Sequence, residues 1–164
     1  MQEIKKTLLS EPVQQAIDAW MTRYPPDQKR SAVLQALMFA QEANHGYLTI
    51  ALMDAVADYL DLPHVAVYEV VSFYTLYNTK PVGKHIINIC TNLSCQLNDA
   101  EKILHHVEKR LGIHLNQTTP DGKFTLREVE CLAACINAPV AQIGKKYHEN
   151  LTTEKIDAIL KELE

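Results

Sequence analysis

The apolar residues of the first 80 positions recur every three or four residues, the spacing that places them on one face of a helix. Four such segments follow one another, separated by residues typical of caps and turns. The last is rich in Val and Tyr, so its pattern also fits a strand. The first half therefore predicts a bundle of short helices. We expect the first three helices to begin after Ser10, from Asp27 and after Thr49, and the fourth to begin at Pro63. The first is expected to stop at Pro25-Pro26, and the second to end near residues 44–46, where Gly46 suits a left-handed cap.

The pattern changes after residues 78–83, NTKPVG, which we interpret as a connector and a domain boundary. A buried strand is expected over residues 86–90, followed by an amphipathic helix over 99–111 that Gly112 closes. Three strands at 124–129, 140–143 and 146–148 and a last helix after Thr152 complete the chain. The sequence thus predicts an α+β chain, with a helical bundle in residues 1–80 and a small α/β domain in residues 81–164.

Composition and charge narrow the range of functions. Of the 164 residues, 47% are apolar and 22% are charged, which is typical of a globular protein. The net charge is -4 and no block of five Lys or Arg residues occurs, so we expect no nucleic-acid partner. No apolar run has the length of a signal peptide or a membrane span, and no Arg- and Ser-rich transit peptide is present. We therefore expect a bacterial cytoplasmic protein or a processed organellar one, without direct membrane insertion.

Four cysteines are the strongest candidates for chemistry. They form two pairs, Cys90-x4-Cys95 and Cys131-x3-Cys135, with 35 residues between the pairs. Each pair follows a predicted strand, so both pairs are expected at the same end of adjacent strands. A [2Fe-2S] cluster takes two thiolates on each of its two irons, which two such loops can supply. The backbone N–H groups of residues 91–94 and 132–134 would stabilise the negative charge added on reduction.

Other interpretations of the cysteines stay open on spacing alone. Structural zinc also takes four cysteines, although its loops commonly use two-residue spacing. Two disulfides conflict with a reducing compartment, and buried inert cysteines are common in protein cores. A thioredoxin-type redox pair needs Cys-x-x-Cys, which neither pair has.

Several distinctive motifs follow one another along the chain. The first cysteine region contains VYEVVSFY (67–74), PVGK (81–84) and CTNLSC (90–95). The second contains TTPDGKFTL (118–126), ECLAAC (130–135) and AP (138–139). The helical region contains SAVL (31–34), AQE (40–42) and GYL (46–48). In this order the motifs resemble the 24 kDa subunit family of respiratory complex I, the NADH:quinone oxidoreductase, from about residue 30 to the end of the chain.

The resemblance implies a helical bundle followed by a thioredoxin-like domain that binds one [2Fe-2S] cluster. The residues that match the family's metal ligands are Cys90, Cys95, Cys131 and Cys135. It also implies an electron carrier without catalytic residues of its own. The implied partners are the flavin- and NADH-binding subunit and further peripheral-arm subunits of complex I, at the inner face of the bacterial inner membrane or on the mitochondrial matrix side. The equivalent subunit of an NAD-linked hydrogenase or formate dehydrogenase is the alternative.

The spacing of the glycines indicates that the nucleotide binds to a partner and not to this chain. The five glycines lie too far apart to form a dinucleotide or phosphate-binding loop, so we expect NADH and FMN on the partner subunit and not on this chain. In two places the chain departs from the family, which commonly has Gly where Ala133 stands and another Gly near Asn98-Asp99. If position 133 needs a positive φ, alanine costs about 1 kcal/mol there.

The remaining polar and aromatic residues give weaker signals. We expect none of the seven histidines to be a metal ligand, and His105, His106 and His148 to be surface residues. Glu128 and Glu130 are expected to be exposed strand charges. Four aromatic side chains fit either core packing or a contact with the flavin subunit: Tyr68, Phe73, Tyr74 and Tyr77.

Overall fold

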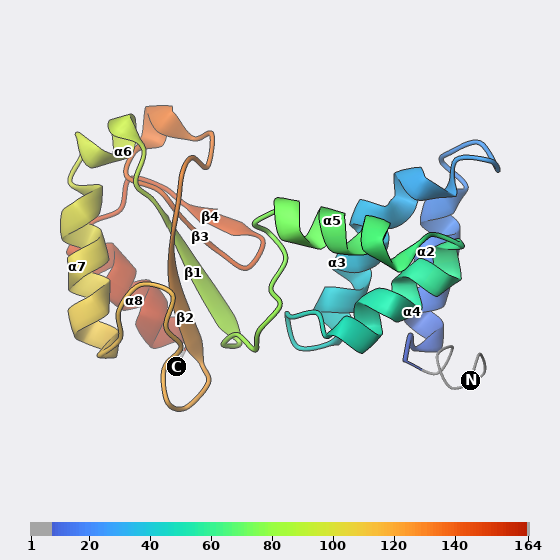
Figure 1. The fold of residues 1–164 in the computed structure, drawn as a ribbon. Coiled ribbons are helices and arrows are strands. Elements are labelled where there is room, and N and C mark those ends of the chain that lie inside the picture. The colour runs from blue at the N-terminus through green and yellow to red at the C-terminus, as the bar shows by residue number, and fades with distance from the viewer. Residues whose placement is uncertain (1–7, 164) are drawn as a thin grey trace. The chain divides into compact units, whose positions relative to one another are not determined.

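The structure of the protein, a computed structural model, describes residues 8–163 (Figure 1). The chain folds into two compact units, Met1–Pro81 and Val82–Glu164, and each has its own hydrophobic core. Within the described residues, every helix is too short or too polar to cross a membrane.

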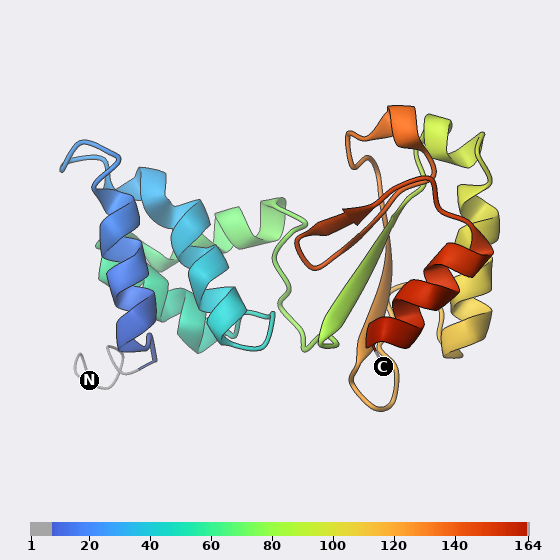
Figure 2. The same cartoon turned by 180° about the vertical axis from the view of Figure 1, so that it is seen from behind.

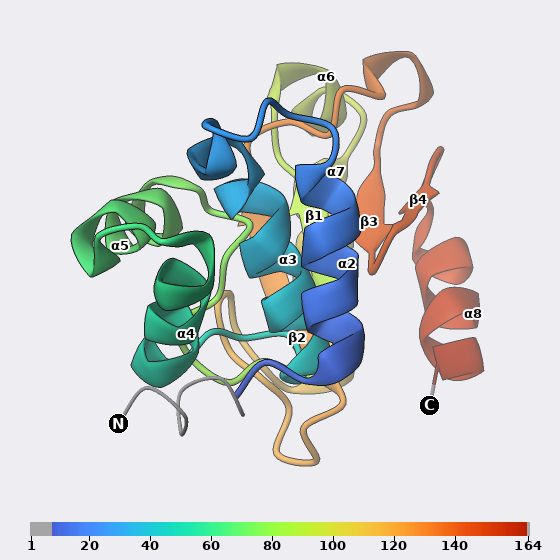
Figure 3. The ribbon, with the colours of Figure 1, turned by 90° about the vertical axis from the view of Figure 1, so that its right-hand side faces the viewer.

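Unit 1 is entirely helical in its described part, as the apolar spacing predicts. Its core contains the fully buried side chains of Ile17, Leu37, Val56 and Val67, one from each α-helix. Figure 3 shows these helices with the loops that join them. The elements are α2 (Glu11–Met21), the 3-10 helix η1 (Lys29–Ala32), α3 (Val33–Ala43), α4 (Ile50–Leu60) and α5 (His64–Phe73).

Several helix ends differ from the sequence expectations. Thr49 caps α4 as predicted, since its Oγ1 accepts a hydrogen bond from the backbone N–H of Leu52 at 3.2 Å. Helix α2 already ends at Met21, so Pro25-Pro26 lie beyond its end and do not terminate it. The segment after Asp27 first makes the η1 turn, and the α-helix begins only at Val33.

The ambiguous segment after Pro63 is helix α5 and not a strand. Its two buried residues, Val67 and Val71, are four positions apart, so they lie on one helical face and pack into the core of unit 1. Tertiary burial of that face outweighs the strand preference of β-branched residues.

Unit 2 has the predicted order β-α-β-β-β-α, with two short helical turns added. Helix α8 is capped by Thr152, whose Oγ1 accepts from the N–H of Lys155 at 3.2 Å. The added turns, α6 and η2, each contain a cysteine, and the apolar pattern does not predict them. The elements are β1 (His85–Cys90), α6 (Leu93–Gln96), α7 (Ala100–Leu111), β2 (Phe124–Val129), η2 (Cys135–Asn137), β3 (Ala141–Ile143), β4 (Lys146–His148) and α8 (Thr153–Leu163).

The sheet of unit 2 has the strand order β2-β1-β3-β4. Strands β1 and β2 are parallel, and the pairs β1–β3 and β3–β4 are antiparallel. Helices α7 and α8 cover one face, seen from opposite sides in Figures 1 and 2. The core between them contains Ile87 and Ile89 of β1, Leu126 of β2, and Val107 and Ile156 of the helices. This mixed sheet, with helices on one face, agrees with the predicted small α/β domain.

Candidate metal centre

The two cysteine pairs lie at one end of the sheet because β1 and β2 are parallel neighbours. Cys90 is the last residue of β1 and is in register with Val129, the last residue of β2. Cys131 comes two residues after Val129, so Cys90 and Cys131 lie at the same end of the two parallel strands. The other cysteines are carried by the short turns: Cys95 by α6 and Cys135 by η2. Figures 1 and 2 both show α6 next to the orange η2 turn at this end.

The sulfur atoms fall into a close group linked across the two loops. Cys131 Sγ lies 4.0 Å from Cys135 Sγ. The Cys90 thiol interacts with those of Cys95 and Cys131, and it donates a weak hydrogen bond to the carbonyl of Glu130 at 3.9 Å. The charge of Cys135 also acts on Cys95. The structure therefore brings together all four cysteines that the sequence singles out.

The two pairs differ in burial. Cys90 and Cys95 are buried and pack with Ala100, Leu132 and Val140 in a small apolar cluster. Cys131 and Cys135 are exposed to solvent. The first pair therefore lies in the interior of unit 2, and the second pair lies at its surface.

Backbone N–H groups surround the sulfurs, as the sequence predicts for residues 91–94 and 132–134. The Ala133 N–H donates to Cys131 Sγ at 3.3 Å. The structure confirms three donors in the predicted segments and adds one, Val140, which no sequence pattern indicates. The remaining contacts are from Asn92 and Leu132 to Cys90, and from Val140 to Cys95.

These surroundings affect the two buried thiols differently. Burial raises the pKa of Cys95 to about 11, and the neighbouring Cys90 shifts it in the same direction. Burial also acts to raise the pKa of Cys90. The N–H groups of Asn92 and Leu132 and the thiols of Cys95 and Cys131 outweigh that effect, so the pKa of Cys90 lies below its ordinary value. Of the two buried thiols, Cys90 therefore has the lower pKa and carries negative charge more readily.

The loop after Cys131 contains a residue in a strained backbone conformation. Ala133 has φ +56°, in the left-handed region that favours glycine. Asp99, at the second departure from the family pattern, has φ +64°. Asn98 supports that turn because its side-chain Nδ2 donates to the carbonyl of Ser94 at 2.8 Å. Both departures therefore put a side chain where the backbone favours glycine.

The spacing of the exposed cysteines suits two ligands of one metal ion. Two thiolates bound at about 2.3 Å to one tetrahedral metal ion lie roughly 3.8 Å apart, close to the 4.0 Å between Cys131 Sγ and Cys135 Sγ. Structural zinc and the iron of a [2Fe-2S] cluster both take tetrahedral thiolate ligands, so this spacing fits both kinds of site. Within residues 8–163, no group of three or more His, Cys, Asp or Glu side chains is placed to hold a single metal ion.

Several histidines contact carboxylates away from the cysteines. His64 has a structural role that the sequence does not indicate: its Nδ1 lies 3.1 Å from Asp54 and its Nε2 lies 2.7 Å from Asp58, which joins α5 to α4. Glu128 and Glu130 are exposed, as predicted. Two further contacts occur in unit 2: His105 with Glu108 at 3.0 Å, and His106 with Asp157 at 2.9 Å.

The aromatic stretch at the end of unit 1 divides between core and surface. Tyr77 is buried, and its hydroxyl donates to the carbonyl of Leu34 at 2.8 Å. Phe73 is exposed. Both roles are open from the sequence, and the structure assigns the core role to Tyr77.

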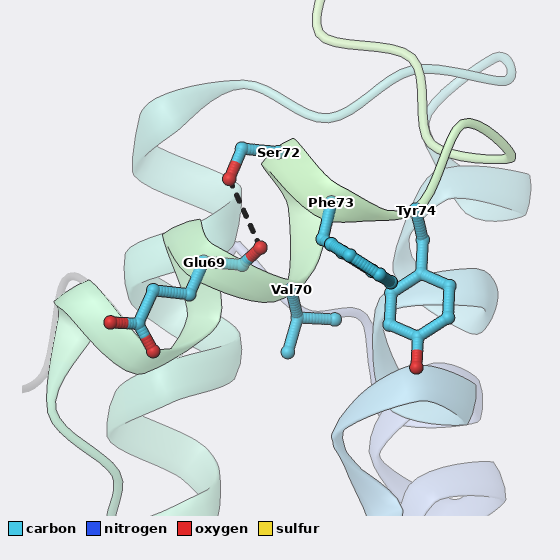
Figure 4. Close-up of a pocket in the computed structure, with 5 residues that line it drawn as sticks. All are labelled: Glu69, Val70, Ser72, Phe73 and Tyr74. Atoms are coloured by element: carbon cyan, nitrogen blue, oxygen red, sulfur yellow. Dashed lines mark hydrogen bonds between the residues drawn. The ribbon is translucent and has the colours of Figure 1, made fainter.

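A shallow pocket of about 560 Å³ lies on α5 in unit 1 (Figure 4). In Figure 4, the Ser72 hydroxyl donates to the carbonyl of Glu69 at 3.0 Å. Because that pocket contains one carboxylate and no other charged group, it offers no donor set comparable to the cysteines. Its lining residues are Glu69, Val70, Ser72, Phe73 and Tyr74.

Comparisons with known proteins agree with this geometry. Residues 17–164 match the family model described as thioredoxin-like [2Fe-2S] ferredoxin. A Rickettsia felis protein, named as a subunit of NADH-quinone oxidoreductase, is 47% identical over 140 residues, 85% of this chain and 84% of the relative. A Rhizobium meliloti protein, also named as a subunit of NADH-quinone oxidoreductase, is 46% identical over 148 residues, 90% of this chain and 86% of the relative.

The fold also occurs in a larger protein. A crystal structure of an NAD+-reducing [NiFe]-hydrogenase in the air-oxidised state aligns with a TM-score of 0.70 at 19% identity. The alignment covers 85% of this chain but only 24% of the hydrogenase chain. At this identity, the likeness shows a shared fold.

Proposed function

Because this chain belongs to the thioredoxin-like [2Fe-2S] ferredoxin family, we propose that it carries single electrons as a subunit of an NADH:quinone oxidoreductase. It binds one [2Fe-2S] cluster through Cys90, Cys95, Cys131 and Cys135. The bound cluster supplies one-electron oxidation and reduction. The observation that carries the proposal is the placement of both cysteine pairs at the same end of the parallel strands β1 and β2.

The protein's own residues then have three roles. The four thiolates hold the cluster, with one pair anchored in the core and the other at the surface. The N–H groups of Asn92, Leu132, Ala133 and Val140 point at the sulfurs and stabilise added negative charge. The apolar residues around Cys90 and Cys95 limit access of water from the inner side. Electron transfer needs no acid, base or nucleophile, so the chain has no catalytic residue of its own.

The electron donor is the flavin- and NADH-binding subunit of the same complex, where FMN and NADH bind. Two features support this partner. The relatives are named as one subunit of an NADH-quinone oxidoreductase, and this chain has no glycine-rich loop for a dinucleotide. Further peripheral-arm subunits complete the complex. The chain then lies on the inner side of the bacterial inner membrane, or on the matrix side in an organelle.

A second host complex is supported by one observation, the fold shared with part of an NAD+-reducing hydrogenase. In that case the chain has the same cluster and the same kind of flavin partner, and the final acceptor differs. A formate dehydrogenase would be a third host of this kind. Genes next to the one for this chain discriminate among them, since each complex has its own companion subunits.

The test is whether NADH can reduce the cluster through the partner. The chain is expressed together with the FMN-containing subunit of the same organism's NADH:quinone oxidoreductase and purified without oxygen. We expect an EPR signal of spin one-half after addition of NADH, of the same shape as the signal produced by dithionite. A Cys131→Ser variant should lose or alter that signal, while Ser94→Ala, between the ligands of the first pair, should keep it.

Two results would contradict the proposal. A signal with dithionite but none with NADH would mean that the flavin subunit is not the donor. Bound zinc, with no signal under either condition, would assign the cysteines to a structural metal site.

A further inference from the structure

The short turn η2, which begins with Cys135, is joined by a side chain to a later part of unit 2. Asn137 ends this turn, and its side-chain Nδ2 donates a hydrogen bond to Glu149 Oε2 at 2.8 Å. Glu149 directly follows β4, so it belongs to the segment that connects β4 to α8. The Asn137 side chain therefore links the turn that contains a cysteine to a segment twelve positions further along the chain.

The segment over residues 149–151 is itself held by the core of unit 2. Leu151 is 5% exposed and packs with the core residues of that unit. Two backbone hydrogen bonds join the segment to the chain after η2: the N–H of Asn150 donates to the carbonyl of Asn137 at 2.8 Å, and the N–H of Leu151 donates to that of Pro139 at 3.0 Å. Asn137 is thus held through both its backbone and its side chain.

The second cysteine pair depends on such a contact more than the first pair does. Cys90 ends β1 and, like Cys95, is buried in a small apolar cluster. Cys131 and Cys135 are exposed, and Ala133 between them has a strained backbone. An exposed and strained loop opens more readily than a buried strand, because few buried contacts oppose its opening. The position of Cys135 therefore depends on the hydrogen bonds that hold η2.

We propose that Asn137 is a positioning residue for the cluster, because its hydrogen bond to Glu149 holds the η2 turn and keeps the Cys135 thiolate directed at the iron. This inference rests on the proposed function, which supplies the cluster. The bond acts through the backbone, since Cys135 and Asn137 are the two ends of one three-residue turn. Without the bond the turn opens more often, the thiolate leaves the iron, and the cluster is lost sooner.

The test measures the rate at which the full-length, cluster-loaded chain, kept without oxygen, releases iron to an excess of an iron chelator. Asn137→Ala removes the donor and should speed iron release about 3–10-fold, the factor expected for one partly exposed hydrogen bond. Asn137→Asp should speed it by about 10-fold or more, because two carboxylates then face each other at hydrogen-bond distance. Release from Asn137→Ala at the parent rate would overturn the inference.

A reversed hydrogen bond separates the role of the bond from the role of the charge. The double variant Asn137→Asp with Glu149→Gln has the carboxylate at position 137 and the amide at position 149, so both side-chain shapes and the total charge equal those of the parent chain. The amide now donates to the carboxylate. Iron release should therefore return to within about threefold of the parent rate. A double variant as fast as Asn137→Asp alone would contradict the positioning role.

The matched control is Gln117→Ala. Gln117 lies in the exposed loop between α7 and β2, where its Oε1 accepts a hydrogen bond from the N–H of His114 at 3.0 Å. The control removes a comparable bond from unit 2 without changing η2, so it should release iron at the parent rate. If it releases iron as fast as Asn137→Ala, general weakening of unit 2 explains the effect and the positioning role is overturned.

The parent chain separates this inference from the proposed function. If the parent holds two irons and two sulfides while the variants at position 137 keep the parent rate of iron release, the positioning role fails and the proposed function stands. If the parent chain holds no cluster when purified without oxygen, the proposed function fails, and the inference fails with it.

Discussion

Replacement of Ala133 by glycine should stabilise unit 2. Ala133 lies between Cys131 and Cys135 with φ +56°, and its N–H donates to Cys131 Sγ at 3.3 Å. The hydrogen bond holds the residue in a backbone region where its Cβ is crowded. Glycine has no Cβ, so Ala133→Gly keeps the N–H donor and removes the strain.

The size of the effect follows from two opposing contributions. The left-handed conformation costs an L-residue roughly 1–2 kcal/mol, which glycine recovers. Glycine also has more freedom in the unfolded chain, which lowers stability by about 0.5–1 kcal/mol. The net gain for Ala133→Gly is therefore about 0.5–1 kcal/mol. The neighbouring Ala134 has φ -115°, so Ala134→Gly has no strain to relieve and should destabilise by roughly 0.5–1 kcal/mol.

The assay is equilibrium unfolding of the cluster-free full-length chain by urea in reducing buffer. Far-UV circular dichroism reports both units, whereas fluorescence of Trp20, the single tryptophan, reports unit 1. With a slope of about 1–3 kcal/mol per molar urea, the midpoints of the two variants should differ by roughly 0.3–2 M, and Ala133→Gly should be the more stable variant. The Trp20 transition should stay where it is in the parent chain.

The reasoning is refuted if both glycine variants lose stability by the same amount. That result would show that position 133 has no strain to release in the folded chain. A shift of the Trp20 transition in either variant would show that the units do not unfold independently, so that the midpoints could not be assigned to the loop.

Three further predictions each concern the stability of one unit. Gly83→Ala should destabilise unit 2 by about 1–3 kcal/mol in urea unfolding, because the added Cβ would lie 2.7 Å from the Phe124 carbonyl carbon. Gln41→Met should lower the stability that Trp20 reports by about 1–3 kcal/mol, since it removes the side-chain acceptor of the buried Asn78 N–H, now at 2.7 Å; an unchanged midpoint would contradict this. Burial lowers the pKa of His148, so the unfolded chain binds a proton there more readily. Unit 2 should lose stability as the pH falls below about 6.5, and His148→Gln should reduce that loss in urea titrations at successive pH values.

The sequence predicts those parts of the fold that depend on local patterns. Apolar spacing places the helices, and a strand before each cysteine pair places the pairs at one end of the sheet. Thr49 and Thr152 cap their helices as predicted, since a cap needs only residues next to it in the chain. The usual glycine of the family at position 133 raises the question of a positive φ, and the structure answers it with φ +56° at Ala133.

The remaining features depend on contacts between distant segments. The N–H of Val140 reaches Cys95 only after β3 is placed beside β1, and no local motif indicates that contact. The exposure of Phe73 depends on where α5 packs, so an aromatic residue in an apolar helix is compatible with either outcome. Helix α2 ends at Met21, before the proline pair, so the position of Pro25-Pro26 in the sequence does not give its last residue.

The most direct test of the central claim is the metal and sulfide content of the chain purified without oxygen, together with an EPR spectrum after dithionite reduction. The account predicts two irons, two acid-labile sulfides and one spin one-half signal per chain, as one [2Fe-2S] cluster on the four cysteines requires. One zinc ion per chain, without sulfide and without a signal, would contradict it and leave the cysteines as a structural site.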